Sequence, residues 1–181
     1  MRTLILYTSS AGSTKAYAEE IALGMGTEAI EFNKKKFRKM NLDDYDTIVY
    51  GGWVKGSQIQ GIDDFLSRWE DMEKKNVILF SCGMSAVYKE VRDNLISANL
   101  LDLYHLRFYP LRGSFDYSKL NFRDKMMMKL GLQQALAMGK GEDKDNNFLQ
   151  QALQQPFVYK DTEGVNRILS VLHRLASEQN A

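Results

Sequence analysis

The sequence predicts an α/β fold in which helices cover both faces of a parallel β-sheet. Short, continuously apolar runs alternate along the chain with segments whose apolar residues recur at helical spacing. Such runs are typical of strands buried on both faces, and their alternation with helices favours parallel pairing. The length of 181 residues suits one domain with one core. We therefore expect residues 1–181 to form a single three-layer α/β/α domain.

Five segments are expected to supply the strands. Three of them are strong, because each is apolar almost throughout and ends at small or polar residues. The strong segments are Thr3–Tyr7, Asp46–Tyr50 and Asn76–Phe80. Glu28–Phe32 is a weaker strand, and the last core strand is expected within Asp102–Tyr109. The pattern thus predicts a five-stranded, doubly wound sheet.

Helices are expected between and after these strands. In each, apolar residues recur every three or four positions, which defines one buried face. The four expected helices are Thr14–Met25, Ile62–Met72, Tyr88–Asn99 and Thr162–Ser177. The basic run Lys34–Lys39 between the second and third strands is interpreted as a solvated surface.

Residues 111–155 have a different pattern, with no clear buried strand. They contain a Met-rich segment, a polar stretch over 139–147 and a Gln-rich helix candidate, Phe148–Gln155. A short strand candidate, Phe157–Tyr159, follows. We expect residues 111–155 to be a helical insertion near the last strand of the same domain.

The Met-rich segment has an apolar face with basic residues around it. The apolar residues are Phe122, Met126, Met127 and Leu130, and the basic residues are Arg123, Lys125 and Lys129. Flexible thioethers form adaptable apolar surfaces, so this face suits a large planar substrate, a quinone or a peripheral membrane contact through residues 122–138. The alternative is that the methionines simply pack on the sheet.

Composition argues against several classes of function. The 24 basic and 23 acidic residues give a formal charge of +1, so no basic excess predicts a nucleic-acid partner. Cys82 is the only cysteine and there are two histidines, which argues against an internal disulfide and a metal centre. No apolar run reaches the roughly 20 residues that cross a bilayer. We expect a cytoplasmic protein without a transmembrane segment or a signal peptide.

The first strand is followed by a loop of small and hydroxyl-bearing residues. Ligands of open parallel sheets bind beyond the carboxyl ends of the strands, where helix N-termini offer unpaired backbone N–H groups. The G-x-G-x-x-G fingerprint and the P-loop lysine are both missing, which favours a monophosphate held by amides and hydroxyls. The predicted cradle consists of Ser9, Ser10, Ala11, Gly12, Ser13 and Thr14. The alternative is an ordinary strand–helix turn with Thr14 near the N-cap.

This cradle resembles the phosphate loop of the flavodoxin family. The family signature after the first strand is T/S-x-T-G-x-T, which matches here at Ser9, Gly12 and Thr14 and departs at Ala11. The resemblance implies a flavodoxin-like fold, with FMN held at the carboxyl edge of the sheet by this loop and two further loops. Ala11 removes one hydroxyl, for which Ser10 and Ser13 partly compensate.

The resemblance assigns two later segments to the flavin ring. Within Gly51–Ser57, Trp53 is expected against one ring face, although it could instead cap the core. The segment Ser81–Ser85 lacks the aromatic residue that family members often carry, which leaves Met84, Tyr88 or the insertion for the other face. Cys82 is expected to be a buried small hydrophobe. The predicted ring-contacting residues are Gly52, Trp53, Val54, Lys55, Ser81, Cys82, Gly83 and Met84.

Two segments of the last third resemble a narrower group. Leu111–Tyr117 and Phe122–Lys129 are similar to the corresponding region of the flavodoxin-like, quinone-linked protoporphyrinogen dehydrogenases, which carry a Tyr-containing turn and a Met-rich helix there. This resemblance implies a porphyrinogen-like or quinone-like substrate. We expect residues 111–147 to form a lid or docking surface beside the flavin.

Two function classes fit these residues. The first is an FMN-dependent oxidoreductase or electron-transfer protein, which exchanges electrons with a redox partner or a small molecule. The second is a flavodoxin-fold binding or regulatory module without redox activity, which Ala11 and the missing aromatic residue would allow. The near-neutral charge favours a dedicated oxidoreductase over a small acidic shuttle. No catalytic acid or base is assigned, since electron transfer at a flavin needs none.

Overall fold

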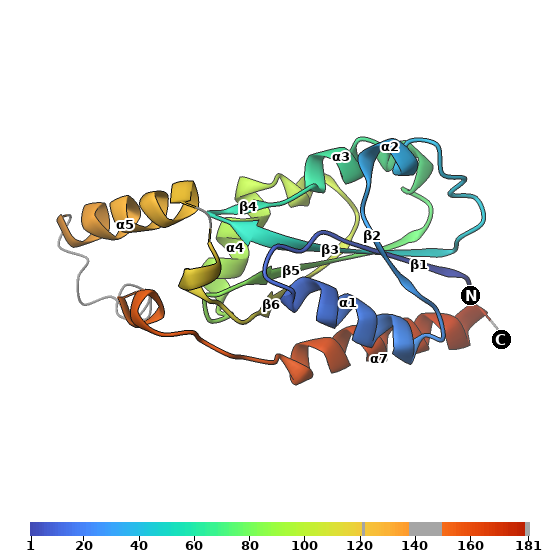
Figure 1. Cartoon of the computed structure of the whole chain (residues 1–181). Coiled ribbons are helices and arrows are strands. Elements are labelled where there is room, and N and C mark those ends of the chain that lie inside the picture. The colour runs from blue at the N-terminus through green and yellow to red at the C-terminus, as the bar shows by residue number, and fades with distance from the viewer. Residues whose placement is uncertain (121, 138–149, 180–181) are drawn as a thin grey trace. The chain divides into compact units, whose positions relative to one another are not determined.

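The computed structural model describes residues 1–120, 122–137 and 150–179 (Figure 1). The chain forms two compact units, Met1–Gly113 with Asp161–Ala181 and Ser114–Lys160, and each is described by itself. The first unit holds five parallel strands and one short strand that pairs antiparallel with β3. The strands are β1 (Thr3–Tyr7), β2 (Ala29–Glu31), β3 (Thr47–Lys55), β4 (Gln58–Ile59), β5 (Asn76–Gly83) and β6 (Arg107–Arg112).

The parallel strands lie in the order β2-β1-β3-β5-β6. Numbered along the chain, the five parallel strands therefore have the doubly wound order 2-1-3-4-5, in which the winding direction reverses between β1 and β3. β1 pairs with β3 from Thr3↔Thr47 to Tyr7↔Gly51, so the carboxyl ends of both strands meet at one edge. The predicted α/β fold with a flavodoxin-like parallel sheet is confirmed.

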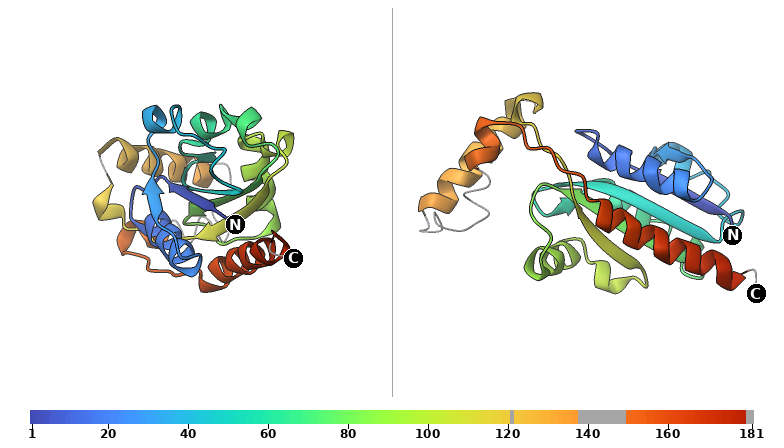
Figure 2. Two further views of the ribbon diagram at one scale, coloured as in Figure 1. Left: turned by 90° about the vertical axis from the view of Figure 1, so that its right-hand side faces the viewer. Right: turned by 90° about the horizontal axis from the view of Figure 1, so that it is seen from below.

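Helices cover both faces of the sheet (Figures 1 and 2). On one face, α1 and α7 bury apolar side chains, including Ile21 and Ile168, against Ile5, Val49 and Ile78. On the other, the core includes side chains from α2, α3 and α4. The helices of the first unit are α1 (Ser13–Gly24), α2 (Lys34–Phe37), α3 (Ile62–Leu66), α4 (Lys89–Ala98) and α7 (Thr162–Gln179), with short 3-10 helices η1 (Trp69–Asp71) and η2 (Leu101–Leu103).

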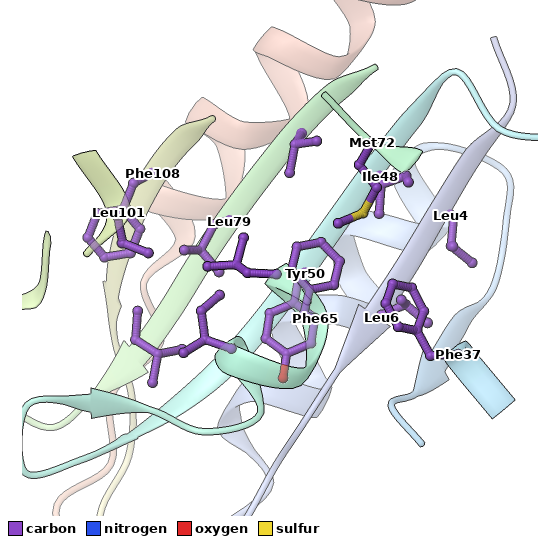
Figure 3. Packing of buried hydrophobic residues seen from close by; sticks show 14 of the residues in the cluster. Leu4, Leu6, Phe37, Ile48, Tyr50, Phe65, Met72, Leu79, Leu101 and Phe108 are labelled. Atoms are coloured by element: carbon purple, nitrogen blue, oxygen red, sulfur yellow. The ribbon is translucent and has the colours of Figure 1, made fainter. Parts of the chain in front are cut away.

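Aromatic residues fill the layer between β3 and α3 (Figure 3). The ring of Tyr50 stacks on that of Phe65, with centroids 4.6 Å apart. Inside the core, the Tyr50 hydroxyl donates to the carbonyl of Gln60 at 2.8 Å, and burial raises the pKa of Tyr50 above its usual value. Thr8 donates to the same carbonyl at 2.9 Å. These bonds fix the segment before α3 beside the end of β1.

Two strands are longer than the sequence pattern predicts. β3 continues past Tyr50 to Lys55, and β5 continues past Phe80 to Gly83. The cause is pairing within the sheet, because the β3–β5 ladder extends as far as Trp53↔Cys82. Gly51 belongs in this strand because a Cβ there would lie 2.1 Å from the ring of Phe80. The glycine accommodates an aromatic neighbour within a regular strand.

Two further elements differ from the prediction. The last core strand starts at Arg107, because Leu101–Leu103 forms a 3-10 helix. The expected helix Ile62–Met72 is divided into α3 and η1, with Arg68 at φ −112° between them. Arg68 donates from Nη1 to the carbonyls of Phe37 at 2.6 Å and Met40 at 2.8 Å. This contact with the end of α2 accompanies the break in the helix.

The second unit contains η3 (Tyr117–Lys119) and α5 (Phe122–Ala137). Residues 150–154 are helical, in agreement with the end of the candidate helix Phe148–Gln155, whereas 138–149 lie outside the described residues. The candidate strand Phe157–Tyr159 forms only an isolated antiparallel bridge, in which Phe115 and Phe157 exchange two backbone hydrogen bonds of 2.7 Å. None of the helices described in either unit is long and apolar enough to cross a membrane.

Candidate functional site

The candidate site lies at the carboxyl edge of the sheet in the first unit. β1, β3, β5 and β6 run parallel, so the segments that leave them start at this edge. The segment after β1 leads to α1 on one face, and the segment after β3 leads to α3 on the other. Diverging loops at such a switch point create the crevice where open α/β sheets bind ligands. The predicted segments 9–14, 52–55 and 81–84 all lie at this edge.

The β1–α1 loop leaves the N-terminus of α1 without a capping side chain. Gly12 is the N-cap residue, with φ +95°, a left-handed conformation that glycine adopts without strain. No side chain caps the helix, and its first turn contains no acidic residue. Ser10, Ala11 and Gly12 are exposed. The partial positive charge of the helix N-terminus is therefore accessible at the switch point.

Both ends of this loop are fixed by hydrogen bonds. At its start, the Thr8 N–H donates to the carbonyl of Gly51 at 2.8 Å. Within it, the Gly12 N–H donates to Ser9 Oγ at 3.1 Å, and the Ala16 N–H donates to the Gly12 carbonyl at 2.9 Å. The loop is thus held as a tight turn, with its middle residues on the surface.

Thr14 and Cys82 lie together beneath the loop. Thr14 is 1% exposed and Cys82 is 7% exposed, and the Thr14 side chain forms a hydrogen bond with the thiol. Burial raises the pKa of Cys82 to about 12, while the hydrogen bond with Thr14 acts in the opposite direction. The thiol is therefore protonated and buried at neutral pH, as a small hydrophobe would be.

We expect Cys82 to react with a chromogenic disulfide reagent at about pH 8 at least about tenfold more slowly in the native protein than in the unfolded chain. The reason is that burial suppresses the thiolate, which is the reactive form. Cys82 is the only cysteine, so the released chromophore reports this site alone. The raised pKa also means that the protonated thiol stabilises the fold fully below about pH 9 and that this contribution is lost as the pH rises towards 12. Equal reaction rates in the native and unfolded chains would contradict the burial of this thiol.

The second predicted segment is a β-hairpin rather than a loop. Trp53 and Val54 continue β3, Val54 pairs with Ile59 of β4, and the Gln60 N–H donates to the Trp53 carbonyl at 2.9 Å. Trp53 is half-buried, and Lys55 is exposed near the tip. The structure thus places Trp53 on a paired strand at the edge of the site.

Asn99, which the sequence pattern does not distinguish, fixes this hairpin. Its side-chain oxygen accepts the Ile59 N–H at 2.8 Å, and its amide group donates to the carbonyls of Ser57 and Leu95, both at 2.8 Å. Asn99 is buried at the end of α4. It joins two segments that are far apart in the chain, so no local signal could identify it.

The third predicted segment divides between the core and the surface. Ser81 and Cys82 are buried, and successive side chains of a strand point to opposite faces. The Ser81 hydroxyl has no hydrogen-bond partner among the residues that the structure describes. Gly83 and Met84 are only partly buried. Within this segment, it is therefore Gly83 and Met84 that reach the surface of the edge.

Arg112 is a second residue that the sequence does not assign to the cofactor site. Its Nε donates to the carbonyl of Met84 at 3.1 Å. The neighbouring Gly113 N–H donates to the carbonyl of Gly83 at 2.7 Å. These bonds connect the end of β6 with the loop after β5 and place a guanidinium group beside it. One sequence signal could have indicated that Arg112 lies near the site. It follows an apolar pair directly, at the end of a strand.

A buried network joins α1, β6 and α7 behind this edge. Tyr17 donates to the carbonyl of Arg112 at 2.6 Å and accepts the Asp161 N–H at 2.8 Å. The Asp161 carboxylate accepts the Arg112 N–H at 3.1 Å and the Gly164 N–H at 2.9 Å. The network holds together the places where the chain leaves and re-enters the first unit.

A polar hollow of about 470 Å³ lies at the opposite, amino edge of the sheet. Its lining includes Asp43, Asp46, Glu70, Lys74 and Asn76, which belong to segments at the starts of β3 and β5. Charged residues of both signs surround it, and apolar walls are scarce. In the described parts of both units, no cluster of His, Cys, Asp or Glu could hold a metal ion.

Comparison with solved structures finds similar proteins among the flavodoxins. The chain is similar to the oxidised flavodoxin 2 of Bacillus cereus (20% identity, 62% of this chain and 84% of that chain, TM-score 0.46). It is also similar to a flavodoxin from the domain Archaea (17% identity, 70% and 90%, TM-score 0.44) and to reduced Megasphaera elsdenii flavodoxin (20% identity, 60% and 82%, TM-score 0.40). No curated protein matches the chain.

The family assignment comes from a different comparison. The sequence model described as a flavodoxin domain matches residues 4–145, which include all three predicted site segments and most of the sheet. FMN is the cofactor that this domain implies. The match extends over most of the sequence, and the chain therefore belongs to the flavodoxin domain family.

Proposed function

We propose that this protein is an FMN-dependent oxidoreductase that exchanges electrons with a redox partner or a small molecule. The observation that carries the proposal is the uncapped N-terminus of α1 at the switch point, with Gly12 in the left-handed conformation. Flavodoxin-like sheets bind FMN at this switch point. A helix N-terminus binds phosphate through backbone N–H groups and therefore needs no lysine in the loop.

The residues of the β1–α1 loop fit the phosphate of FMN. A Cβ at Gly12 would meet no atom within 4 Å, so the space beside this backbone is open to a ligand. No carboxylate in the first turn of α1 opposes an anion. The residues proposed to hold the phosphate are Ser9, Ser10 and Ser13 through hydroxyls, Ala11 and Thr14 through backbone N–H groups, and Gly12 through the open space beside its backbone.

The hairpin and the loop after β5 are proposed to flank the flavin ring. Trp53, Val54 and Lys55 stand on one side, with Gly83 and Met84 on the other. FMN, when bound, accepts and donates electrons singly or in pairs, while the protein supplies position and electrostatics. Asn99 holds the Trp53 hairpin in a fixed place, and the exposed Lys55 favours negative charge nearby.

A porphyrinogen-like donor or a quinone-like acceptor is the proposed substrate class, on the resemblance of Leu111–Tyr117 and Phe122–Lys129. The second unit supports it with an exposed apolar surface on α5. Phe122, Met126, Met127 and Leu130 are 78%, 49%, 62% and 50% exposed. Such a surface suits a large planar ligand or a membrane contact through residues 122–138, of which Met138 lies outside the described residues.

We also propose that residues 111–147 serve as a lid or docking surface for this substrate.

A titration of the flavin spectrum with quinone, porphyrinogen and nicotinamide compounds identifies the substrate class. The proposal requires that a porphyrinogen reduces the oxidised flavin or that a quinone reoxidises the reduced flavin. A response to nicotinamide alone would contradict it.

Flavin content tests the proposed function directly. We expect the purified protein to be yellow, to release FMN on denaturation, and to bind added FMN when stripped. A colourless protein that does not bind added FMN would overturn the proposal. That result would favour the alternative of a flavodoxin-fold binding module without redox activity.

A further inference from the structure

We propose that the basic residues beside the switch point form a docking surface for an acidic electron-transfer protein. The inference rests on the proposed function, because it names the kind of partner that would approach the flavin. We call this surface the basic rim and define it as Lys34, Lys35 and Lys36, all exposed after the carboxyl end of β2.

The basic rim lies next to the proposed phosphate loop. β2 pairs with β1 up to Tyr7↔Glu31, and the Phe32 N–H donates to the Tyr7 carbonyl at 2.7 Å. α2 begins two residues later, with Asn33 as its N-cap, whose side chain accepts the Lys36 N–H at 3.0 Å. The lysines therefore follow the carboxyl end of the strand that neighbours β1.

Contacts with α3 also fix the position of the basic rim. Lys34 forms an ion pair with Asp64 in the first turn of α3. That helix begins directly after Gly61, where a Cβ would lie 3.1 Å from the side chain of Thr8. Thr8 is the residue that opens the phosphate loop. The ion pair thus anchors one end of the run, and the two lysines after it extend along α2.

Lys35 and Lys36 have no ion-pair partner among the residues described in the structure. Phe37, which follows them, is 2% exposed and packs in the core. This buried ring holds the run as an ordered surface rather than a loose basic arm. Lys35 and Lys36 therefore present two uncompensated positive charges at a fixed position on α2.

The near-zero net charge conceals a separation of charge between the two edges. At the amino edge, carboxylates outnumber lysines around the polar hollow, where Asp43, Asp46, Glu70, Asp71 and Glu73 lie with Lys74 and Lys75. At the carboxyl edge, Asp64 pairs with Lys34, and Asp93 pairs with Lys89 and Arg92, while the carboxylates of Glu31, Asp63 and Glu90 are exposed. Such a distribution orients a negatively charged partner towards the carboxyl edge.

The composition of the rim favours a protein over other anionic partners. The one aromatic residue of the run, Phe37, is buried and cannot stack on bases. The run also offers no exposed apolar side chain to insert between lipids. An acidic protein surface, in which carboxylates are more widely spaced, satisfies the lysines without these conflicts.

The test is binding of an oxidised, acidic plant-type 2Fe–2S ferredoxin to the FMN-loaded protein, measured by calorimetry at low and high salt. We expect the double variant Lys35→Glu/Lys36→Glu to weaken binding about tenfold or more at low salt, and the difference to disappear at high salt. The matched control, Lys74→Glu/Arg174→Glu, changes the net charge equally, away from the carboxyl edge of the first unit, and its affinity for ferredoxin is expected to stay within about twofold of the wild-type value.

Each outcome has a distinct meaning. Equal binding by the rim variant and the wild-type protein would overturn the docking surface, as would no binding of ferredoxin to the wild-type protein. Binding of duplex DNA or phosphatidylserine vesicles that depends on Lys35 and Lys36, without ferredoxin binding, would also overturn it. Flavin content is measured on the same samples. Failure of the wild-type protein to hold FMN would contradict the proposed function. The comparison of ferredoxin binding between the wild-type protein and the rim variant tests the docking surface separately.

Discussion

Ser10→Asp is expected to lower the affinity for FMN about a thousandfold. Ser10 is exposed in the β1–α1 loop, so the fold tolerates either a hydroxyl or a carboxylate there. A carboxylate about 4 Å from a phosphate would cost on the order of 4 kcal/mol at an effective dielectric constant of about 20. Fluorescence titration of the stripped protein with FMN measures the change.

The matched control for this prediction is Ser10→Asn. Asparagine has nearly the same size as aspartate and lacks the charge, so it separates electrostatic repulsion from steric fit. We expect its affinity for FMN to fall less than about tenfold, because the asparagine amide can still donate a hydrogen bond to the phosphate. If Ser10→Asp binds FMN as well as Ser10→Asn does, the phosphate does not lie at this loop.

Asp161→Ala is expected to lower the free energy of unfolding by about 3 kcal/mol, because the carboxylate has two structural roles. One oxygen accepts the Gly164 N–H in the first turn of α7, and the other accepts the Arg112 N–H at the end of β6. Asp161 is 9% exposed, so water cannot fully replace these bonds. Chemical denaturation followed by circular dichroism measures the loss.

Glu163→Ala is the control for this stability prediction. Glu163 lies in the same turn, and its side chain is exposed in a 3.4 Å pair with Arg167. Exposed pairs of this kind contribute little, so we expect a change below about 1 kcal/mol. Equal stability of the two variants would show that the network of Tyr17, Arg112 and Asp161 does not hold the unit together.

The parts of the fold that the sequence predicts are those decided by local pattern. The apolar run Thr3–Tyr7 has the same bounds in the structure, because every residue of β1 is buried. The helix Thr162–Ser177 also agrees closely with α7, whose apolar face is regular. The β1–α1 loop could be placed at the carboxyl edge for the same reason, since small and hydroxyl-bearing residues stand together in one short segment between a strand and a helix.

The parts that the sequence does not predict depend on contacts between distant residues. The pair Gly51–Gly52 suggests a flexible loop, but Phe80 and the β5 ladder make this segment a strand. Asp161 meets Tyr17 across a separation of 144 residues. Asn99 and Arg112 likewise act on segments far from them in the chain. No pattern within a window of 10 or so residues carries such information.

We propose that the β1–α1 loop holds the phosphate of FMN at the switch point of the sheet. Two-dimensional amide NMR of the labelled protein during titration with FMN tests it most directly. We expect the amides of residues 9–14 to shift first and furthest among the assigned signals of the first unit, and the amides around Asp43 and Glu70 at the amino edge to stay unchanged. Unchanged signals for residues 9–14 while FMN binds elsewhere on the protein would contradict it.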